Sequence, residues 1–374
     1  MKNETTQQMK KEPSNHRGPH LLSGMAPKPW FQLLFGGGVI SLRRLPDVIE
    51  ITLRSSQFRP LTLRERSFRG AEVAAHTPNT RPIFIIGHYR SGTTYLHNLM
   101  ARDPQFAFPT LFDVAFPHAF LSAEDILKPI IEKALPETRC SDNLALSVNA
   151  PQEDEFAIGK LSPYCFYHGL YFPKKMKCLF DRGVLLNGSA DRTAWADLYR
   201  AFLTKVSLKG EGRVLLLKNP AHSARIDLLL EMYPQARFIH IHRHPIEVYR
   251  STRHLFATYI RTYGFQSVSE RAVDEMVRYT YENLMPRLFE GTAHIPKGQF
   301  VEVCFDDLKN DALSVLKSIY DTLKLDTCDD LFARFAKYVD EQKTFQANTY
   351  SPNTMEEEII RQRWQFAFER LGYT

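Results

Sequence analysis

The segment 82–96, PIFIIGHYRSGTTYL, decides the fold of this chain. It begins with a short apolar run, Pro82–Ile86, and an uninterrupted run of this kind is typical of a strand buried on both faces of a parallel sheet. A loop with two glycines follows, and a helix is expected over 94–101. A strand, a glycine-containing turn and a helix in this order form the arrangement that cradles an anion at a helix N-terminus.

The residues of the loop suit such an anion site. Gly87 and Gly92 permit the tight backbone turns that a cradle needs. The amides of residues 91–94 are then expected to point at the anion, which the helix dipole also attracts. The alternative is a glycine-containing turn that binds nothing, but such a turn does not need the arginine and hydroxyl residues that stand beside these glycines.

The loop differs from that of a nucleotide triphosphatase, which would read G-x-x-x-x-G-K-[ST]. Thr93 stands where the lysine should be, and the cation comes earlier, at Arg90. The strand expected over 237–242 is followed by Arg243, with no acidic residue there to hold magnesium. The loss of both features argues against phosphoryl transfer from ATP, so a P-loop nucleotide kinase or NTPase is only the alternative interpretation.

Beyond the loop, strands and helices alternate along the chain. Further strands are expected over 214–217, 237–242 and 300–304, and further helices over 223–232, 245–259, 311–323 and 331–339. Strand–helix units in this order predict an α/β fold, with an open parallel sheet flanked by helices. The stretch 105–212 is richer in proline and aromatic residues, and it predicts a largely helical insertion that would wall a pocket.

Composition sets limits on function. The 374 residues are 44% hydrophobic and 24% charged, as in an ordinary soluble globular protein, which excludes a fibrous or wholly disordered chain. The net charge is +6, and residues 1–81 hold 13 Lys and Arg against 6 Asp and Glu, which favours an anionic surface or ligand. Nucleic acid is not an expected partner, because the sequence has no zinc-finger spacing, RNP-type motif or basic–aromatic stripe.

The sequence predicts three parts. These are a disordered basic tail over 1–24, an amphipathic helical segment over 25–80 and the main domain over 81–374. In the helical segment, apolar residues recur at helical spacing at Leu42, Leu45, Val48, Ile49 and Leu53. The segment either packs on the main domain or lies in a membrane surface, with Trp30, Phe31 and Phe35 as anchors and arginines facing lipid phosphates.

The cysteines indicate a reducing compartment. They are Cys140, Cys165, Cys178, Cys304 and Cys328. An odd number with no C-x-x-C spacing favours neither a disulfide framework nor a zinc site. The first 20 residues also lack the apolar core of a signal peptide, so a cytoplasmic protein is expected, peripheral on the membrane if the helical segment binds lipid.

The loop and a second motif together resemble a known family. R-S-G-T-T after a strand resembles the 5′-phosphosulfate loop of sulfotransferases that use 3′-phosphoadenosine 5′-phosphosulfate (PAPS), and it is most similar to the bacterial-type branch. Arg243 and Ser251, eight residues apart across a strand-to-helix turn, resemble the family's 3′-phosphate site. The resemblance implies a P-loop-type sheet with PAPS as co-substrate. The residues that it implies for PAPS binding are Gly87, Arg90, Ser91, Gly92, Thr93, Thr94, Arg243 and Ser251.

Other parts of the donor site are less well defined by the resemblance. Arg250 and Arg253 are either additional contacts or members of a solvated helix face. The glycine-rich C-terminal loop of the cytosolic branch has no match, and Gln342–Tyr350 is the stretch that could approach the 3′-phosphate instead. A third element, the run 218–222 (KNPAH), resembles the K-[ST]-P-x-[HY] motif, with Asn219 in place of Ser or Thr.

The implied chemistry is an in-line displacement, in which an acceptor hydroxyl attacks sulfur and the 5′-phosphate leaves. Charge builds on the leaving phosphate, so fixed cations and amides aimed there should contribute most to catalysis. By their positions, Arg90, Thr93, Thr94 and Lys218 fit this role. No metal is required, because these cations already serve the leaving group.

The acceptor hydroxyl also needs a base, and the sequence leaves several candidates. The run 151–156, PQEDEF, resembles the P-x-E-D-E element of the bacterial-type branch, and it favours Glu153 as the base, with Glu155 next. A solvated acidic helix start is the alternative. His222 is either a second candidate base or a structural histidine, and His88, inside the loop, could contact the sulfuryl group or the acceptor.

The acceptor itself is indicated only by the character of the insertion. Residues 105–180 contain many phenylalanines and tyrosines, and apolar pockets accept apolar ligands. Together with the basic amphipathic front end, they favour a small-molecule or lipid acceptor, a lipid-like or sterol-like alcohol over a sugar. The expected activity is PAPS-dependent O-sulfotransfer; a catalytically silent, membrane-associated anion-binding module is the further alternative. The sequence does not determine the oligomeric state.

Overall fold

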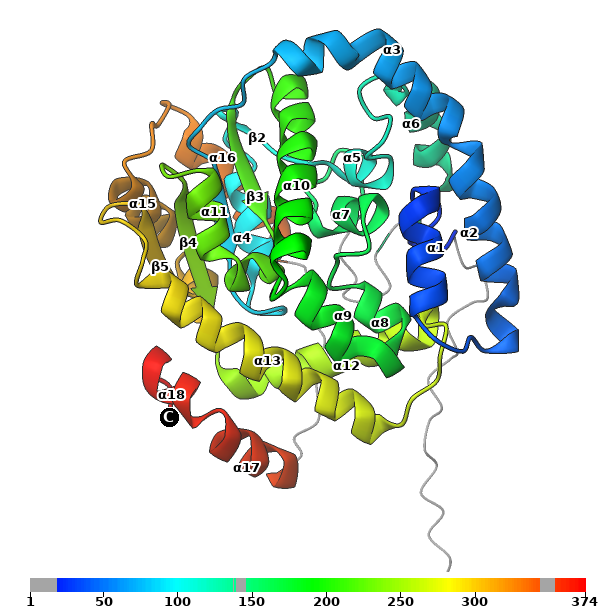
Figure 1. Ribbon diagram of the computed structural model, residues 1–374. Coiled ribbons are helices and arrows are strands. Elements are labelled where there is room, and N and C mark those ends of the chain that lie inside the picture. Colours follow the sequence, from blue (N-terminus) through cyan, green and yellow to red (C-terminus); the bar gives the residue numbers. More distant parts are fainter. Residues whose placement is uncertain (1–18, 137, 139–145, 344–353) are drawn as a thin grey trace, which may run out of the picture.

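The computed structural model describes residues 19–136, 138, 146–343 and 354–374. Its centre is a parallel five-stranded sheet in the order β2-β3-β1-β4-β5 (Figure 1). The strands are β1 (Ile83–Ile86), β2 (Phe106–Ala107), β3 (Val214–Lys218), β4 (Arg237–His242) and β5 (Phe300–Cys304). The α/β fold and its four expected strands are confirmed. The edge strand β2 was not predicted, because two residues are too few to show a periodic pattern.

The register of the sheet brings the motifs to one edge. Ile85 of β1 pairs with Lys218 of β3, and Ile86 of β1 pairs with His240 of β4. Because the strands are parallel, their carboxyl ends meet at the same edge of the sheet. In open α/β sheets, ligands bind at this edge, where the strand order changes direction. The loop that follows β1 therefore lies between the residues that follow β3 and those that follow β4.

Helices cover both faces of the sheet. Ile83 and Ile85 of β1 point into a core with α4 (Thr93–Met100), α15 (Ala312–Leu323) and α16 (Leu331–Gln342). Phe84 and Ile86 point the other way, into a larger core with α10 (Ser189–Lys209), α12 (Pro245–Tyr263) and α13 (Glu270–Thr292). This two-sided burial explains why the strand at the start of the deciding segment is uniformly apolar.

The insertion is largely helical, as expected, and it packs beside the larger core. Its remaining helices are α5 (Leu111–Ala115), α6 (Glu124–Ala134), α7 (Glu155–Leu161), α8 (His168–Tyr171), η2 (Pro173–Lys175) and α9 (Met176–Gly183). α5 begins with a capping box, in which Thr110 and Asp113 each accept a hydrogen bond from the other's backbone amide. Figure 1 shows α7 and α8 between the sheet and the N-terminal helices.

The segment after β3 departs from the expected helix over 223–232. A 3-10 turn, η3 (Pro220–Ala224), comes first, and the α-helix α11 covers only Ile226–Met232. The Asn219 side chain accepts a hydrogen bond from the backbone amide of Ala221, which holds the chain in the tighter turn. The turn delivers His222 and Arg225 to the interior, where both are buried.

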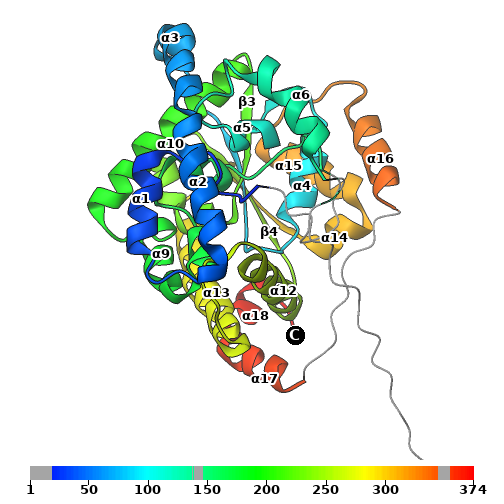
Figure 2. The same cartoon turned by 90° about the vertical axis from the view of Figure 1, so that its right-hand side faces the viewer.

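The C-terminal helices pack beside β5, α12 and α13. α14 (Phe305–Asn310) follows β5, and the last two helices are α17 (Thr354–Arg363) and α18 (Gln365–Leu371). Figures 1 and 2 both place α17 and α18 alongside α12 and α13. Trp364 stacks on Tyr281 of α13 with ring centroids 3.7 Å apart, which fixes the helix pair on the main domain.

The N-terminal helices pack on the main domain. They are α1 (Pro27–Gly36), η1 (Leu42–Arg44), α2 (Leu45–Gln57) and α3 (Arg59–Ala75). Trp30 is fully buried and donates its indole N–H to Thr52 Oγ1 at 2.9 Å, so the expectation of Trp30 as an exposed anchor is wrong. Of the tail expected over 1–24, residues 1–18 lie outside the described residues, whereas His20 and Leu22 are buried.

Two further observations bear on the protein's environment. Among the residues that the structure describes, no helix is both long and apolar enough to cross a bilayer. Cys140 lies outside the described ranges, and the other four cysteines are free thiols. The reducing compartment stays a prediction.

Candidate active site

The loop after β1 has a backbone that requires its two glycines. Gly87 has φ 143° and Gly92 has φ 103°, both in the region that disfavours side chains. A Cβ on Gly87 would also overlap the carbonyl oxygen of Ile241, and one on Gly92 would overlap the ring of Phe305. The cradle is therefore fixed by close packing against β4 and α14.

Hydrogen bonds hold the loop in shape. The Gly87 amide donates to Ser223 Oγ at 2.9 Å, and that hydroxyl lies 3.0 Å from the Gly87 carbonyl oxygen. The Ser91 amide donates to the His88 carbonyl at 3.2 Å, so this amide serves the loop itself. The Thr93 and Thr94 amides belong to the first turn of α4, whose N–H groups have no intrahelical acceptor. An anion above the loop would meet these two amides.

Arg90 connects the loop to α12. Its φ of 71° is unusual for a residue with a side chain, and its Nε donates to Ser251 Oγ at 2.8 Å. Ser251 is buried and Arg90 is half-buried. The arginine of the 5′-phosphosulfate motif and the serine of the 3′-phosphate motif are thus in direct contact, although 161 positions separate them.

Arg243 reaches the same loop from the end of β4. Its guanidinium lies over the Phe305 ring at 4.9 Å, and this ring packs against Gly92. Arg243, Ser91 and His88 line a small cavity. Ser91 Oγ, His88 Nε2 and Arg243 Nε are buried there without a hydrogen-bond partner among the described residues. Unsatisfied polar atoms beside a glycine cradle fit a phosphate-bearing ligand.

Two other arginines of α12 are engaged elsewhere. Arg250 pairs with Glu247 at 2.9 Å and with Glu357 of α17. Arg253 pairs with Asp274 at 2.6 Å and with Glu270 at 2.9 Å. Both arginines thus form ion pairs on or between helices. This favours a helix-surface role for them over the alternative of additional donor contacts.

The C-terminal segment approaches the same side of the site. The Tyr373 hydroxyl lies 2.8 Å from His242 Nδ1, at the end of β4, and Leu371 lines the cavity with Arg243. Most of the stretch expected to approach, Gln342–Tyr350, lies outside the described residues. The sequence offered no motif for the contacts of α18.

On the other side of the loop, four side chains form a continuous chain of contacts. Lys218 Nζ donates to Thr94 Oγ1 at 3.2 Å and to Glu153 Oε1 at 2.6 Å. The Tyr167 hydroxyl donates to Glu153 Oε2 at 2.6 Å. Lys218 and Glu153 are both nearly buried, so this pair is poorly screened by water. The structure thereby brings the predicted lysine and the favoured base to the start of α4.

The next two carboxylates face different partners. Asp154 accepts hydrogen bonds from Tyr199 at 2.5 Å and Asn219 at 2.6 Å. Glu155 pairs with Arg225 at 3.0 Å and accepts a second bond from Asn219 at 2.7 Å. Burial raises the pKa of Glu155, but the Arg225 charge and the hydrogen bonds outweigh it, so the pKa lies below its ordinary value.

Asn219 explains one departure from the family motif. Its side-chain amide nitrogen donates to both Asp154 and Glu155, while its oxygen caps the turn at Ala221. A serine or threonine hydroxyl has a single proton to donate, so it could not serve both carboxylates. The asparagine therefore suits the two buried carboxylates that follow Glu153.

The two candidate histidines are both buried. His222 is fully buried, with Nε2 lying 2.8 Å from the Tyr199 hydroxyl and 3.1 Å from Asp154. His88 Nδ1 bonds the Tyr89 carbonyl at 2.8 Å, and its ring lies against Tyr281 at 4.8 Å. Burial lowers the pKa of His88 to about 4, so it is neutral near pH 7.

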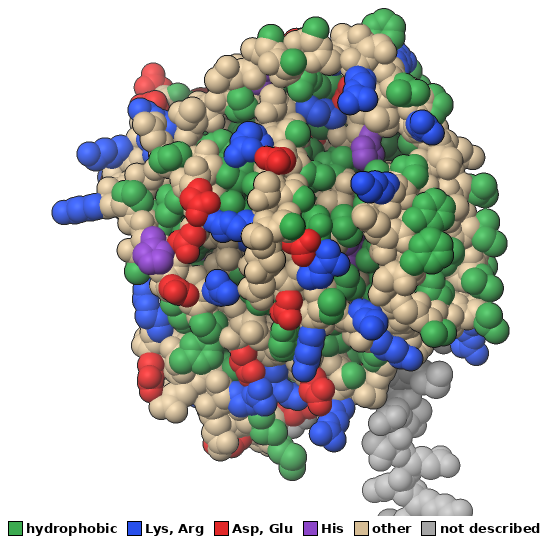
Figure 3. Space-filling view, viewed as in Figure 1, with side chains coloured by type: hydrophobic (Ala, Val, Ile, Leu, Met, Phe, Trp, Pro, Cys, Tyr) green, Lys and Arg blue, Asp and Glu red, His purple; other side chains and the backbone are tan. Residues whose placement is uncertain are grey.

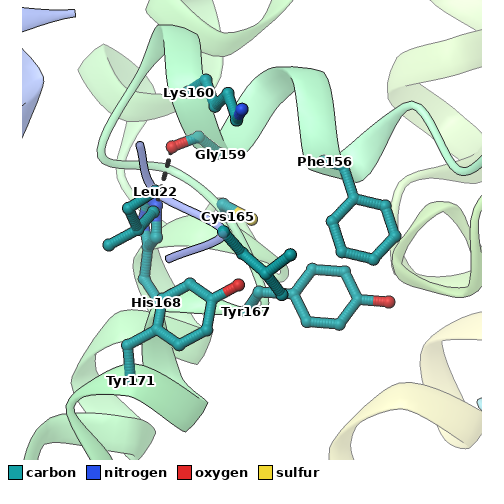
Figure 4. Close-up of a pocket in the computed structure, with 9 residues that line it drawn as sticks. Leu22, Phe156, Gly159, Lys160, Cys165, Tyr167, His168 and Tyr171 are labelled. Atoms are coloured by element: carbon teal, nitrogen blue, oxygen red, sulfur yellow. Dashed lines mark hydrogen bonds between the residues drawn. The ribbon is translucent and has the colours of Figure 1, made fainter. Parts of the chain in front are cut away.

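A second cavity lies beneath the N-terminal segment, beside the Tyr167 side chain that bonds Glu153. Figure 4 shows Leu22, Phe156, Tyr167 and Cys165 around it. Tyr167 separates this cavity from Glu153. At its rim, Lys160 Nζ donates to the carbonyls of Ser23 at 2.9 Å and Ala115 at 2.8 Å, which ties the N-terminal segment to the insertion.

Sequence reasoning missed three residues of the site. Tyr167 stands in an aromatic run with no distinguishing spacing, and Ser223 follows the recognised KNPAH run by one position. Arg225 carried no signal, because only the fold shows that it is buried against Glu155. The predicted donor residues lie on the loop, except Ser251, which contacts Arg90, and Arg243, which lines a cavity with Ser91.

Comparison with known proteins identifies the family of this chain. A model of the sulfotransferase family matches residues 82–330. Proteins of Mycobacterium bovis and Mycobacterium tuberculosis, both named omega-hydroxy-beta-dihydromenaquinone-9 sulfotransferase Stf3, are 33% identical over 318 residues, covering 84% of this chain and 80% of theirs.

Two solved structures share the fold. Sulfotransferase STF1 of Mycobacterium tuberculosis aligns with a TM-score of 0.63 and 17% identity, over 90% of this chain and 89% of that one. Sulfotransferase STF9 of Mycobacterium avium aligns with a TM-score of 0.67 and 15% identity, over 94% and 88%. The P-loop kinase alternative is thereby set aside, and the chain is an enzyme that belongs to the sulfotransferase family.

Proposed function

We propose that this enzyme transfers a sulfuryl group from PAPS to the hydroxyl of a lipid-like alcohol, with Glu153 as the base. The observation that carries the proposal is the unbroken contact from Thr94 through Lys218 to Glu153 and Tyr167. It joins the N-terminus of the anion-binding helix to a carboxylate within a few ångströms. A donor phosphosulfate and an acceptor hydroxyl need these two groups side by side.

The donor is assigned to the loop and its two neighbours. Gly87 to Thr94 would surround the 5′-phosphosulfate, with Arg90 as its cation. Arg243 and Ser251 would hold the 3′-phosphate, because Ser251 of α12 contacts Arg90 of the loop and Arg243, at the end of β4, lines a cavity with Ser91. The unsatisfied Ser91 Oγ and Arg243 Nε support a ligand with phosphate oxygens at this place.

The reaction follows from the charges around the loop. The acceptor oxygen forms a bond to sulfur as the bond from sulfur to the bridging phosphate oxygen breaks, and the acceptor proton passes to Glu153. Adenosine 3′,5′-bisphosphate leaves with the negative charge. Arg90, Lys218 and the Thr93 and Thr94 amides face the region where this charge develops.

Glu153 is the best base of the three candidates. Its neighbours Lys218 and Tyr167 hold its side chain beside the loop. Glu155 is fully buried against Arg225, and His222 is fully buried against Asp154 and Tyr199. These two residues are positioned to hold the acidic run in place instead of meeting an acceptor.

A lipid-like acceptor is supported by the apolar surroundings and by the relatives. The cavity beside Tyr167 is lined mainly by apolar and aromatic side chains, including Leu21, Leu22 and Phe156. The relatives' name specifies a hydroxylated menaquinone derivative as their substrate. We assign to this chain the same chemical class, a long apolar molecule that ends in a hydroxyl group.

The first test is calorimetric titration with adenosine 3′,5′-bisphosphate, beside Mg-ATP, on the same preparation. Tight, metal-independent binding of the bisphosphate and weak binding of ATP are expected. Transfer of labelled sulfate from PAPS to a long-chain hydroxylated isoprenoid quinol is then expected to exceed transfer to a monosaccharide. Preference for Mg-ATP would overturn the donor assignment, and bisphosphate binding without any transfer would favour the silent module.

A further inference from the structure

The outer surface of the N-terminal helices is unusually apolar. Nine of the fourteen large hydrophobic side chains that are exposed in the described residues lie between positions 31 and 68. They are Phe31, Phe35, Val39, Leu42, Leu45, Ile49, Leu53, Leu63 and Phe68, which together we call the front face. Figure 3 shows hydrophobic side chains gathered on its right-hand side, over α1 and α2. Monomeric soluble proteins seldom concentrate exposed apolar groups in this way unless the surface has a partner.

The front face is distinct from the side that packs on the protein. α1 buries Trp30 and Leu33, and α2 buries Ile51, so the inward contacts of both helices are already made. On the outer side of α2, Leu45, Ile49 and Leu53 recur every four residues and are about half exposed. The apolar residues of the front face are therefore not needed to attach these helices.

Charge at the front face is positive. The acidic residues of α2 and α3 are each paired with a basic side chain: Asp47 with Arg44, Glu50 with Arg54, Glu65 with Lys205 and Glu72 with Arg69. Five exposed basic residues form no salt bridge within the part of the chain that the structure describes: Lys28, Arg43, Arg59, Arg64 and Arg66. Unpaired cations around an apolar surface complement the phosphates of an anionic bilayer.

We propose that the front face docks on an anionic lipid bilayer, with Phe35, Val39 and Leu42 inserted and the surrounding basic residues at the headgroups. These three side chains are the most exposed of the front face, with Phe35 at 80%, Val39 at 87% and Leu42 at 80%. A second copy of the chain is a poorer occupant, because two front faces brought together would place their arginines against one another. The catalytic role of this docking, the supply of a membrane-embedded acceptor, rests on the proposed function.

The front face is connected through the start of α1 to the cavity beside Tyr167. The segment that leads into α1 contributes Leu21 and Leu22 to the cavity beside Tyr167, and Lys160 fixes this segment through the Ser23 carbonyl. The cavity thus lies between the root of α1 and Glu153. A membrane-embedded acceptor would have its hydroxyl end presented to the enzyme on the side where the cavity begins.

The test is sedimentation of the full-length protein with vesicles of phosphatidylcholine alone and of phosphatidylcholine mixed with phosphatidylglycerol. Binding is expected with the anionic vesicles, and it should weaken as salt is raised. Arg43→Glu with Arg64→Glu should weaken binding at least about 25-fold, since each basic residue near an anionic surface contributes about a fivefold factor. Phe35→Ser with Leu42→Ser should weaken binding at least as much.

Matched controls come from exposed residues elsewhere. Met355 is 77% exposed on α17, and Arg271 is an exposed arginine on α13. Met355→Ser and Arg271→Glu should leave vesicle binding unchanged. Equal binding of the front-face and control variants would overturn the proposal. So would a concentration-dependent dimer that front-face variants abolish, if the parent protein fails to bind anionic vesicles.

A comparison of acceptors separates this proposal from the proposed function. Front-face variants should sulfate a short, water-soluble alcohol of the acceptor class at the parental rate, yet lose turnover of the same headgroup embedded in vesicles. If the parent protein binds anionic vesicles but sulfates neither the water-soluble alcohol nor the vesicle-embedded acceptor, the proposed acceptor is refuted and the docking is not. Turnover of the vesicle-embedded acceptor without measurable vesicle binding would refute the docking alone.

Discussion

The two sides of the site are built by different means. On the donor side, the loop 87–94 offers backbone amides and one arginine, and several polar atoms around it have no partner among the described residues. On the acceptor side, the acidic run 153–155 is saturated with side-chain partners from three other segments. The loop owes its shape to glycines within its own sequence. The acidic run, in contrast, depends on side chains that other segments of the fold bring to it.

The acidic run shows what the second kind of construction achieves. Consecutive residues entering a helix point about 100° apart, so three adjacent carboxylates face three directions. Glu153 meets Lys218, Asp154 meets Tyr199, and Glu155 meets Arg225. One carboxylate is thereby left beside the loop, and its neighbours anchor it. Substitutions at these positions should therefore produce effects of different kinds.

Glu153→Gln should give the largest loss of activity. It removes the base while keeping the shape of the side chain, and turnover is expected to fall about 10³-fold. Affinity for adenosine 3′,5′-bisphosphate should change little, whereas the unfolding temperature should fall because buried Lys218 loses its counter-charge. Initial rates with labelled PAPS, calorimetry and thermal unfolding measure these, with Glu275→Gln on the surface of α13 as the control. A rate within tenfold of the parent would show that Glu153 is not the base.

Glu155→Gln should reduce the stability of the fold more than the turnover. It leaves the fully buried Arg225 without its counter-charge, which costs about 3 to 5 kcal/mol of unfolding free energy. Turnover per folded molecule should fall far less than in Glu153→Gln. Urea unfolding measures the loss, and adding Arg225→Met should recover part of it. An unchanged unfolding midpoint would mean that the ion pair does not hold the acidic run.

Arg90→Ala tests the donor side. Turnover is expected to fall about 10²-fold, because one fixed cation is lost from the region where charge develops. Arg102→Ala, on a surface arginine just after α4, is the matched control. Steady-state kinetics with each variant decides the point. Near-parental kcat for Arg90→Ala would remove Arg90 from the catalytic group.

Arg243→Ala should act on affinity more than on rate. It is expected to weaken adenosine 3′,5′-bisphosphate about tenfold, since a charge-assisted hydrogen bond is lost. Adenosine 5′-monophosphate, which lacks the 3′-phosphate, should bind the variant and the parent equally. Calorimetry with both nucleotides separates the two cases, and Arg253→Ala serves as the control. Equal weakening of both nucleotides would place Arg243 outside the 3′-phosphate site.

The pH dependence of stability gives the smallest and most gradual effect. The pKa of Glu155 is lowered below its ordinary value of 4.5, because Arg225 and Asn219 outweigh the opposing effect of burial. A carboxyl group with a depressed pKa stabilises the fold above its ordinary value and loses that contribution as pH falls through the folded-state pKa. The stability difference between the parent and Glu155→Gln should therefore be full at pH 7 and shrink below pH 4.5, as followed by urea unfolding.

The sequence predicted the donor side better than the acceptor side, for the same physical reason. The α/β sheet and the loop are encoded by contiguous apolar runs and glycines, so their positions are readable without tertiary information. The contact between Arg90 and Ser251 could be expected only through the family resemblance, since 161 positions separate them.

The partners of the acidic run could not be read in this way. Nothing local distinguishes Glu153 from Glu155, and the decision depends on the 3-10 turn that brings His222 and Arg225 inward. Likewise, Trp30 is a residue type common in membrane anchors, but here it is buried and bonds Thr52 of α2. Such directions are set by the packing of whole helices.

The assignment of each carboxylate to its own partner also limits how this segment can evolve. Deleting one residue ahead of Glu153 would bring Asp154 to the place beside Lys218, whereas inserting one would move Glu153 to the place where Asp154 meets Tyr199. The role of each acidic residue therefore depends on its exact position in the run, because that position determines which partner it meets. Length variation among descendants of this chain should collect elsewhere in the insertion, where the chain can change length without shifting the acids.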